Sequence, residues 1–415
     1  MQYVIKRSLL EDVQNHLQEK EMSLIVGPRQ AGKTTLMLQL KDYLEKRGER
    51  TLFLNLDFEA DRPFFTSQTA LLNRVRLEFG KDRGYVFIDE IQRKENAGIF
   101  LKGLYDAQIP HKLIISGSGS IELKEKIHES LVGRKRIFEL NTVSFEEFVH
   151  FRTGYRYENR LTEFLSVDTA RAKEFLIEYL NFGGYPRVIL AETLQQKIRL
   201  IDEIYSSYIE KDITYLLRVE KTDAFRNLVK IIAGQIGGMI NFTELSSTLG
   251  ISVQTVKNYL LYAEKTFIVK SVTPYFRNIR KEISKAPLFY FMDLGLRNYS
   301  LGLCGRISLL SEAGFLFQNL IFHVLREKRR YEGVSIHFWR TKDRAEVDFI
   351  MNIGQDVLPV EVKCRELKEV AVGRPLRNFI HTYKPKEAWI INLSLRKELT
   401  INNTSVKCMP FFDLI

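Results

Sequence analysis

The sequence feature that most constrains this chain of 415 residues is a glycine-bounded loop, G-P-R-Q-A-G-K-T, at residues 27–34. A short apolar segment, Leu24–Val26, precedes it, and an amphipathic helical pattern begins at Thr35. Strand, loop and helix in this order are the context in which G-x-x-x-x-G-K-[ST] forms a phosphate-binding P-loop. The glycines let backbone N–H groups curl inward, and the helix N-terminus favours an anion. The loop therefore predicts a nucleoside triphosphate site.

Side chains at the end of this loop have distinct expected roles. Lys33 is expected to reach the β- and γ-phosphates of ATP, and the Thr34 hydroxyl to ligate Mg²⁺. The remaining positions are expected to surround the phosphates mainly through their backbone. The candidate ATP contacts are Gly27, Pro28, Arg29, Gln30, Ala31, Gly32, Lys33, Thr34 and Thr35.

Two acids follow a second apolar strand, Tyr85–Ile88. Asp89 and Glu90 would stand at the carboxyl edge of a parallel sheet, where such sheets bind ligands. Asp89 is expected to hold Mg²⁺, directly or through water, and Glu90 to polarise the attacking water. Any strand can end in two surface acids, but a spacing of about 55 residues from the P-loop favours the catalytic interpretation.

Two further catalytic candidates follow from position. Ser118 closes the candidate strand 112–117, where a hydroxyl would touch the γ-phosphate or the water, and we favour it over Ser116 and over a simple turn serine. Arg134 stands just before the strand 135–140, where an arginine finger reaches a neighbouring subunit, which predicts a homo-oligomer. A solvated basic cluster with the two following basic residues is the alternative.

The chain divides by its apolar patterns. Residues 1–150 alternate short strands with amphipathic helices, as a parallel α/β sheet requires. Residues 151–225 read as charged helices, with a break at Gly183–Pro186. Residues 226–286 are expected to form a winged helix, and residues 287–415 a second α/β domain. The five candidate strands of the first region are 23–26, 51–57, 85–90, 112–117 and 135–140.

The third region contains a helix–turn–helix pattern. Phe242–Leu249 is followed by a Gly250 stop and a second helix, Val253–Glu264, and the segment after it is expected to form a wing. Outward polar side chains on the second helix, and basic ones near exposed-looking Tyr275 and Phe276, suit DNA. A protein-docking or intramolecular role is the alternative. The candidate DNA contacts are Gln254, Thr255, Lys257, Asn258, Arg277, Arg280 and Lys281.

The last region carries acids at strand spacing. Alternation puts Glu346 and Asp348 on one face of a strand, and Glu361 and Lys363 on one face of the next. This is the arrangement of PD-(D/E)xK nucleases, in which Asp348 and Glu361 would bind Mg²⁺ and Lys363 would help activate water.

The ordered series of motifs resembles the AAA+ ATPases, and among them a large set of uncharacterised prokaryotic proteins with a C-terminal domain of unknown function. The segments that carry this resemblance, which runs almost end to end, are GPRQAGKTT, YVFIDEIQ, IISGSGS, LVGRKRIFELNTVSFEEF, GGYPRVI, FTELSSTLGISVQTVKNYLLYAEKTFIV, FYFMDLGLRN and EVDFI…PVEVK. It implies an AAA+ core in which the 112–118 strand lies between the strand before the P-loop, 23–26, and the strand that ends in the two acids, 85–90. These two are the Walker A and Walker B strands. The resemblance also implies a helical lid over the nucleotide, from which Arg187 could sense phosphate, although a surface arginine after the turn is the preferred interpretation of this residue.

The same resemblance directs attention to Gln318. Nuclease-like folds usually supply an acid from the helix before the first strand, and Gln318 occupies that place. An amide is a weaker metal ligand than a carboxylate. A nuclease-like domain that binds without cutting is therefore the preferred interpretation.

Composition completes the expectations. A net charge of +11 favours a polyanionic partner, for which we expect double-stranded DNA. The three cysteines are scattered, which fits a reducing cytoplasm, and no apolar run approaches the ~20 residues of a membrane span. The expected function is a Mg²⁺-dependent ATPase that couples ATP to DNA binding or remodelling. The alternative is a nucleotide-controlled switch whose C-terminal domains bind a protein, without DNA activity.

Overall fold

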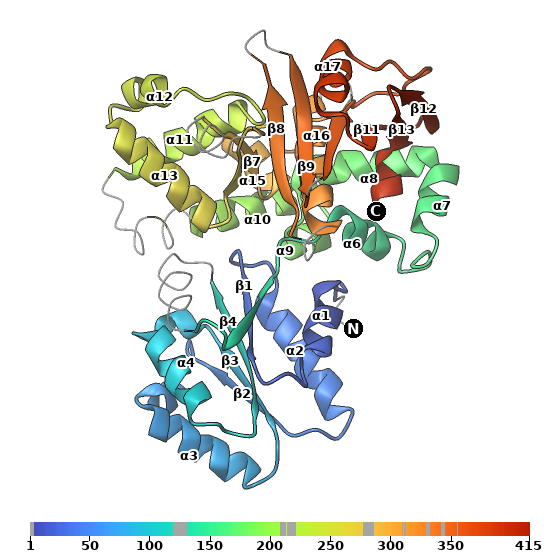
Figure 1. The fold of residues 1–415 in the computed structure, drawn as a ribbon. Coiled ribbons are helices and arrows are strands. Elements are labelled where there is room, and N and C mark those ends of the chain that lie inside the picture. The colour runs from blue at the N-terminus through green and yellow to red at the C-terminus, as the bar shows by residue number, and fades with distance from the viewer. Residues whose placement is uncertain are drawn as a thin grey trace.

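The computed structural model describes residues 4–118, 131–207, 213, 221–276, 286–308, 310, 313–328, 333–341, 345–354 and 356–415. In Figure 1 the N-terminal α/β part forms the lower half of the molecule, and the remaining helices and the second sheet form the upper half. The amino-terminal segment runs between the two halves, and the carboxyl terminus lies in the upper half near α6.

A parallel sheet of five strands organises the lower half. Its order is β2-β3-β4-β1-β5. The expectation that the 112–118 strand lies between the two Walker strands is confirmed, because β4 pairs with both β1 and β3. The strands are β1 (Met22–Gly27), β2 (Thr51–Asn55), β3 (Tyr85–Asp89), β4 (Lys112–Ser118) and β5 (Lys135–Glu139).

Helices cover both faces of this sheet, which explains why β1 and β3 are buried along their whole length, whereas the edge strand β5 is partly exposed. Alternation sends Leu24 and Val26 into the core beneath α3 and α4, and Ile25 into the core beneath α1 and α2. The helices are α1 (Leu9–Asn15), α2 (Lys33–Glu45), α3 (Gln68–Phe79) and α4 (Ala97–Asp106), with short 3-10 turns η1 (Arg62–Phe65) and η2 (Ile91–Arg93).

A layer of helices connects the two halves. It contains α6 (Phe145–Arg152), α7 (Leu161–Val167), α8 (Thr169–Phe182), α9 (Pro186–Leu190), α10 (Leu194–Ser207) and α15 (Leu294–Ser300). Although α15 comes from the region expected to form the last domain, it packs on α8. Its Asn298 Nδ2 donates to the carbonyls of Leu180 and Asn181 at 2.8 and 2.9 Å. Asp293 caps α15 and accepts the Gly184 N–H at 2.8 Å.

Beside this layer lie α11 (Thr222–Gly234), α12 (Phe242–Leu249) and α13 (Val253–Lys265), followed by the antiparallel pair β6 (Val269–Val272) and β7 (Leu288–Phe291). Gly250 has a φ of 61°, which ends α12 and allows the tight turn. The Ser252 hydroxyl then caps α13 by accepting the Thr255 N–H. The boundary expected between residues 225 and 226 falls inside α11, and β7 lies beyond the expected end at residue 286.

The expectation that Tyr275 is exposed is wrong. Its N–H donates to the Phe338 carbonyl at 2.6 Å, and its ring meets that of Tyr383 edge-on, with the centroids 5.5 Å apart. Tyr275 therefore packs into the core of the C-terminal domain, and Phe276 beside it is half-buried. A polar, basic neighbourhood in the sequence concealed this tertiary contact.

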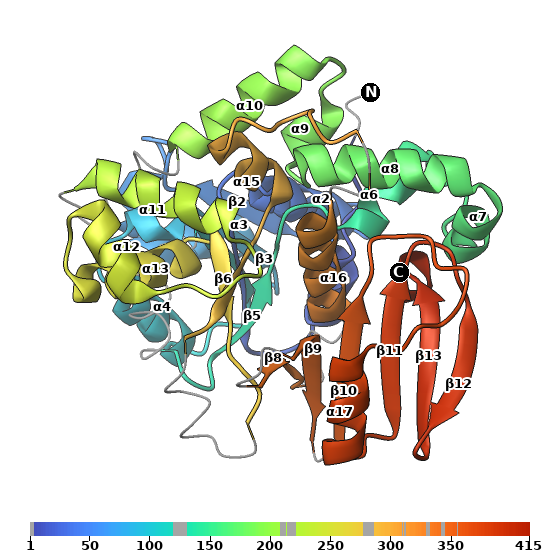
Figure 2. The same cartoon turned by 90° about the horizontal axis from the view of Figure 1, so that it is seen from above.

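The C-terminal sheet has the order β12-β13-β11-β10-β9-β8, and Figure 2 shows it edge to edge along one side of the molecule. Phe349 of β9 joins the core with α16, whereas Ile350 joins the cluster beneath α17, so helices pack on both faces. The elements are α16 (Gly314–Lys328), β8 (Ser335–Arg340), β9 (Glu346–Ile353), β10 (Asp356–Val362), α17 (Arg374–Tyr383), β11 (Glu387–Asn392), β12 (Lys397–Ile401), β13 (Thr404–Pro410) and the 3-10 turn η5 (Phe411–Leu414).

Within the ranges described, no helix is both long enough and apolar enough to cross a membrane.

Candidate functional site

The glycine loop lies between β1 and α2, as its sequence predicts. Gln30 and Gly32 have φ angles of 57° and 98°, the left-handed conformations that curl the loop. Lys33 is buried at the start of α2, and its Nζ donates to the carbonyls of Gly27 at 3.1 Å and Pro28 at 2.8 Å. The loop is therefore formed, with its lysine held inside it.

Asp89, fully buried at the carboxyl end of β3, is the hub of the site. The Thr34 hydroxyl donates to its Oδ2 at 2.7 Å, and the amide of Asn55, from the neighbouring strand β2, donates to the same oxygen at 3.3 Å. The Ser116 hydroxyl and the Glu90 N–H donate to Oδ1. The Thr34 hydroxyl and the Asp89 carboxylate supply the oxygen ligands that Mg²⁺ prefers, so the residues present fit this ion.

Glu90 follows directly, in a left-handed conformation with a φ of 57° that is uncommon for a residue with a side chain. Its carboxylate accepts a hydrogen bond from the side-chain amide of Gln92. Burial, and next the negative charge of Asp89, raise the pKa of Glu90 above its ordinary value. A raised pKa at the mouth of a cavity is typical of a carboxylate that takes up a proton.

A pocket of about 770 Å³ opens over the loop. Lys33, Thr34 and Glu90 belong to its polar lining, which also includes Arg7, Arg29, Gln30, Thr35, Gln39, Arg187 and Ser207. Helix α9 also contacts the loop, since its Arg187 donates to the Gln30 side chain at 3.3 Å. The apolar lining comes from the amino-terminal segment, α2 and α9: Val4, Ile5, Leu38, Pro186 and Leu190.

The other two catalytic candidates, Ser118 and Arg134, lie at opposite edges of the parallel sheet. Ser118 is at the carboxyl end of β4, and Arg134 is at the amino end of β5. Ser118 ends β4 and pairs in register with Gly27 of β1, but its side chain lies outside the described residues. Arg134 stands at the amino end of β5, opposite its own P-loop. There its Nε donates to Asp106 at 2.9 Å, and its guanidinium lies 5.9 Å from the centre of the Tyr105 ring.

The candidate DNA residues are only partly described. On α13, Gln254 and Lys257 are exposed, and Thr255 and Asn258 are half-buried. Gln254 donates to Asn258 at 3.0 Å along the helix. The basic candidates Arg277, Arg280 and Lys281 lie outside the described residues.

Of the four carboxylate oxygens of Asp348 and Glu361, three have partners, and Glu361 Oε2 is buried without a hydrogen bond. Asp348 Oδ1 accepts the amide of Gln318 at 3.0 Å, and Oδ2 accepts the Val362 N–H at 2.7 Å. Lys363 lies 2.6 Å from Glu361 Oε1. Across the described ranges, no three histidine, cysteine or acidic side chains gather where they could hold a metal. Gln318 thus turns its donor, not a ligand oxygen, toward Asp348.

Sequence reasoning missed two residues of the P-loop site. Asn55 ends β2, and Arg7 precedes α1; its guanidinium donates to the Ala31 carbonyl at 2.9 Å. The end of a strand beside the Walker B strand could have directed attention to Asn55. No local signal singles out Arg7, because its partners lie 24 to 140 residues away in the chain.

Three parts of the chain match family models. Residues 19–149 match a family described as an AAA domain. Residues 173–306 match a domain of unknown function (DUF8612), and residues 313–412 match another (DUF4143).

Similar proteins span most of the chain. An uncharacterised protein of Haemophilus influenzae is 25% identical over 351 residues, which cover 82% of each chain. Another, from Methanocaldococcus jannaschii, is 25% identical over 390 residues, which cover 92% of this chain and 83% of that protein.

Solved structures give weaker matches. A RuvB variant from Thermotoga maritima is 17% identical, with a TM-score of 0.31 over 69% of this chain and 95% of its own. AMPPCP-bound DnaA from Aquifex aeolicus is also 17% identical, with a TM-score of 0.30 over 62% of this chain and 86% of its own. Scores this low support no functional conclusion. The AAA-domain match covers residues 19–149, which contain the five-stranded parallel sheet and the P-loop between β1 and α2.

Proposed function

We propose that the chain is a Mg²⁺-dependent ATPase of AAA+ type. The observation that carries the proposal is the 2.7 Å hydrogen bond from Thr34 to Asp89. It joins the last residue of the P-loop to the buried acid of β3, with Glu90 directly beside them at the mouth of the pocket. A chance glycine loop would not meet a strand-end carboxylate in this way.

Each side chain then has a role. The backbone of the P-loop and Lys33 bind the triphosphate, and Thr34 and Asp89 hold Mg²⁺, which when bound neutralises charge on the phosphate oxygens. Glu90 orients the attacking water and accepts its proton, for which its raised pKa suits it. Ser118 stays a candidate for contact with the γ-phosphate or the water.

Lys33→Ala tests the binding step. Loss of this ammonium should weaken binding of ATPγS by about 100-fold, because it is the side-chain cation that the P-loop motif places for the β- and γ-phosphates. Lys41→Ala on the same helix is the matched control, since Lys41 pairs with Glu45 at the surface. Equal ATPγS affinity in the two variants would contradict the proposal.

Arg134 is proposed to act on the nucleotide of a neighbouring subunit. Its place at the amino edge of the sheet supports this, because the length of β1, roughly 17–20 Å, separates it from its own P-loop. Release from Asp106 would free the guanidinium for the neighbour. Arg134→Ala and Glu90→Gln should each be inactive alone, yet mixing them should restore part of the hydrolysis. No recovery at any mixing ratio would exclude this role.

For the partner, we propose double-stranded DNA, bound through α13 as the second helix of a winged helix. The order α11, α12, turn, α13 and the pair β6–β7 supports this, and so do the exposed Gln254 and Lys257 at one end of α13. Hydrolysis should rise with duplex DNA at low salt and lose this rise as salt increases. Lys257→Ala should reduce it, whereas hydrolysis indifferent to DNA would favour the protein-binding switch.

For the C-terminal domain, we propose a nuclease-like fold that binds without cutting. The amide that Gln318 donates to Asp348 supports this, as does the pairing of Lys363 with Glu361. Duplex and single-stranded DNA should survive prolonged incubation with the protein and Mg²⁺ or Mn²⁺. Cleavage that disappears in Asp348→Asn would contradict the proposal.

A further inference from the structure

Arg7 connects three parts of the chain that are distant in sequence. Its side chain is only 8% exposed, and its guanidinium uses all its nitrogens. Nε donates to Glu147 Oε2 at 2.9 Å, Nη1 to the Ala31 carbonyl at 2.9 Å, and Nη2 to the carbonyls of Asn141 and Thr142 at 2.7 and 3.2 Å. One side chain thus joins the amino-terminal segment, the P-loop and the connection from β5 to α6.

The contact with Ala31 bears on the phosphate site. In a trans peptide the carbonyl of one residue and the N–H of the next point in opposite directions. Arg7 therefore fixes the Ala31–Gly32 peptide plane and keeps the Gly32 N–H turned away from the guanidinium. Gly32, with its φ of 98°, has the backbone freedom to lose this orientation when nothing holds it.

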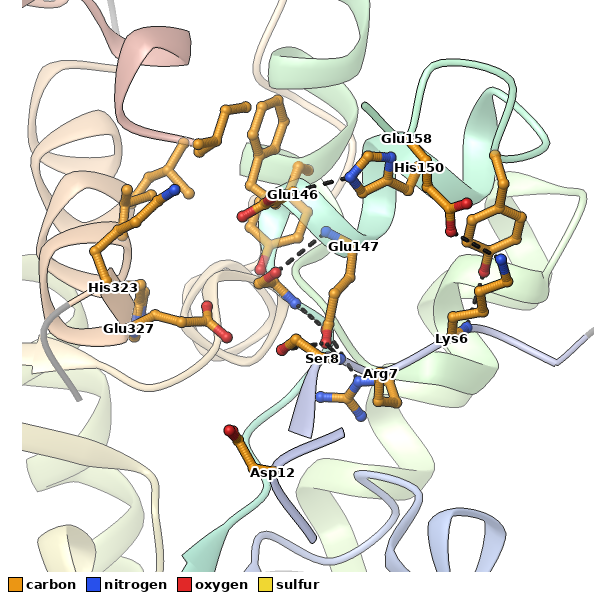
Figure 3. Close-up of a pocket in the computed structure, with 18 residues that line it drawn as sticks. Lys6, Arg7, Ser8, Asp12, Glu146, Glu147, His150, Glu158, His323 and Glu327 are labelled. Atoms are coloured by element: carbon orange, nitrogen blue, oxygen red, sulfur yellow. Dashed lines mark hydrogen bonds and ion pairs between the residues drawn. The ribbon is translucent and has the colours of Figure 1, made fainter. Parts of the chain in front are cut away.

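The contact with Glu147 connects Arg7 to the start of α6, on the side away from the P-loop. Glu147 Oε2 also accepts the Ser144 N–H at 3.0 Å, which completes the capping box of α6. Its Oε1 accepts from the N–H and the hydroxyl of Ser8 at 2.7 and 3.1 Å. Figure 3 shows Glu147 pointing toward Ser8 and Arg7, beside a pocket that His323 and Glu327 border from α16.

Beyond its cap, α6 packs into the upper half of the molecule. The Phe145 ring lies 5.4 Å from Tyr179 of α8 and 5.7 Å from Phe411 of η5, at the end of the C-terminal domain. A displacement of Glu147 would therefore disturb a helix that contacts both the lid and the C-terminal domain.

We propose that Arg7 is a positioning residue that orients the P-loop for ATP and, through Glu147, links the loop to α6. The proposal rests on the function proposed above, because it assumes that the loop binds a triphosphate. Arg7 touches no reacting atom. An ATP molecule that holds the loop around its phosphates would tighten the Arg7–Glu147 pair and so stabilise the start of α6.

Arg7→Lys is the informative variant. Lysine keeps the positive charge in this buried position, but a single ammonium cannot serve four acceptors in a plane. The KM for ATP should rise by about tenfold to 100-fold, since a charge-assisted hydrogen bond that orients the loop is lost. The kcat should stay within about threefold, as expected when uniform binding is removed.

Hydrogen exchange of the α6 amides separates coupling from a merely structural role. In the wild type, ATPγS at about 100 times its Kd should slow this exchange by about tenfold or more. Glu147→Gln removes the charge that ties Arg7 to the cap. In that variant the slowing should fall below about twofold, while ATPγS still binds. Lys6→Ala is the control, because the neighbouring Lys6 pairs with Glu158 at the surface.

The outcomes are distinct. A wild-type protein and a Lys6→Ala variant that both fail to bind ATPγS would overturn the proposed ATPase function, and this inference with it. If both bind, a wild-type KM in Arg7→Lys, or α6 exchange that ATPγS does not slow in the wild type, would overturn the inference alone. Should Arg7→Lys not fold, the exchange of α6 in Glu147→Gln decides.

Discussion

Two strand-end clusters of acids in this molecule look alike in sequence and differ in structure. At the P-loop, Asp89 accepts from a Thr34 hydroxyl that can also turn a lone pair to a metal, and Glu90 faces a pocket of about 770 Å³. In the C-terminal sheet, Asp348 accepts the Gln318 amide and a backbone N–H. There a lysine ammonium neutralises Glu361, the second acid.

The difference teaches that residue type and spacing propose a metal site, whereas the donors already present decide whether it can form. Both carboxylates accept N–H groups, Asp89 from Asn55 and Glu90, and Asp348 from Gln318 and Val362, so what separates the two sites is the hydroxyl beside Asp89. A hydroxyl is both donor and acceptor, so Thr34 can hold Asp89 without a metal and share the metal with it. The two sites therefore call for paired substitutions.

The largest expected effect comes from neutralising the acid in each site. Asp89→Asn should lower ATP turnover by about 100-fold or more, because the variant loses the carboxylate that holds Mg²⁺. Asp348→Asn, the matched change in the other sheet, should leave turnover within about twofold. Steady-state phosphate release measures both. Equal losses in the two variants would show that the C-terminal acid belongs to the ATPase mechanism.

A smaller effect is expected from a substitution that gives the C-terminal site around Asp348 the additional oxygen ligand it lacks. Gln318→Glu replaces the amide donor with a carboxylate beside Asp348 and supplies the acid that the site lacks. Mn²⁺ should then bind at least about tenfold more tightly than to the wild type, by calorimetry on a protein whose P-loop carries Lys33→Ala. If the wild type already binds Mn²⁺ as tightly in the same background, Gln318 does not block the site.

The contribution of the C-terminal site around Asp348 to the stability of the protein should depend on pH. Burial raises the pKa of Asp348 from 3.8 to about 7, so the folded state holds this proton more tightly than the unfolded chain does. Ionising Asp348 therefore costs stability increasingly from about pH 4 to pH 7. Between pH 5 and pH 8, the free energy of unfolding of Asp348→Asn should therefore rise by about 1–2 kcal/mol relative to that of the wild type. Urea unfolding at the two pH values measures it, and a gain that shrinks with pH would contradict this sign.

The smallest effect concerns the pKa of Glu90. Because Glu90 acts as a base with a raised pKa, kcat should fall on the acid side with a midpoint above 4.5. The Gln92 hydrogen bond lowers this pKa, so Gln92→Ala should move the midpoint upward. A midpoint that moves downward would show that Gln92 does not stabilise the charged carboxylate.

Much of the P-loop site could be predicted because its signals are local. A glycine loop between a strand and a helix, and two acids at a strand end, are readable without the fold. The strand order followed from the family resemblance. Arg7 and Asn55 were missed because only the folded sheet brings them to the loop and to Asp89.

The remaining errors also come from long-range packing. Tyr275 precedes a basic segment in the sequence, yet its ring packs against Phe379 of α17 and its N–H donates to Phe338 of β8. Helix α15 follows the strand pair in the chain, yet Asn298 fastens it to the carboxyl end of α8. Apolar periodicity gives the type of an element but not the layer against which it packs.

The measurement that tests the central claim most directly is the amount of ATP that the Glu90→Gln protein binds and the rate at which it hydrolyses this ATP. The amide preserves the size of the side chain but cannot take a proton from water. The account predicts close to one unhydrolysed ATP retained per chain, with turnover reduced by about 10²–10⁴-fold. Undiminished turnover in Glu90→Gln would contradict the claim that this site hydrolyses ATP with Glu90 as its base.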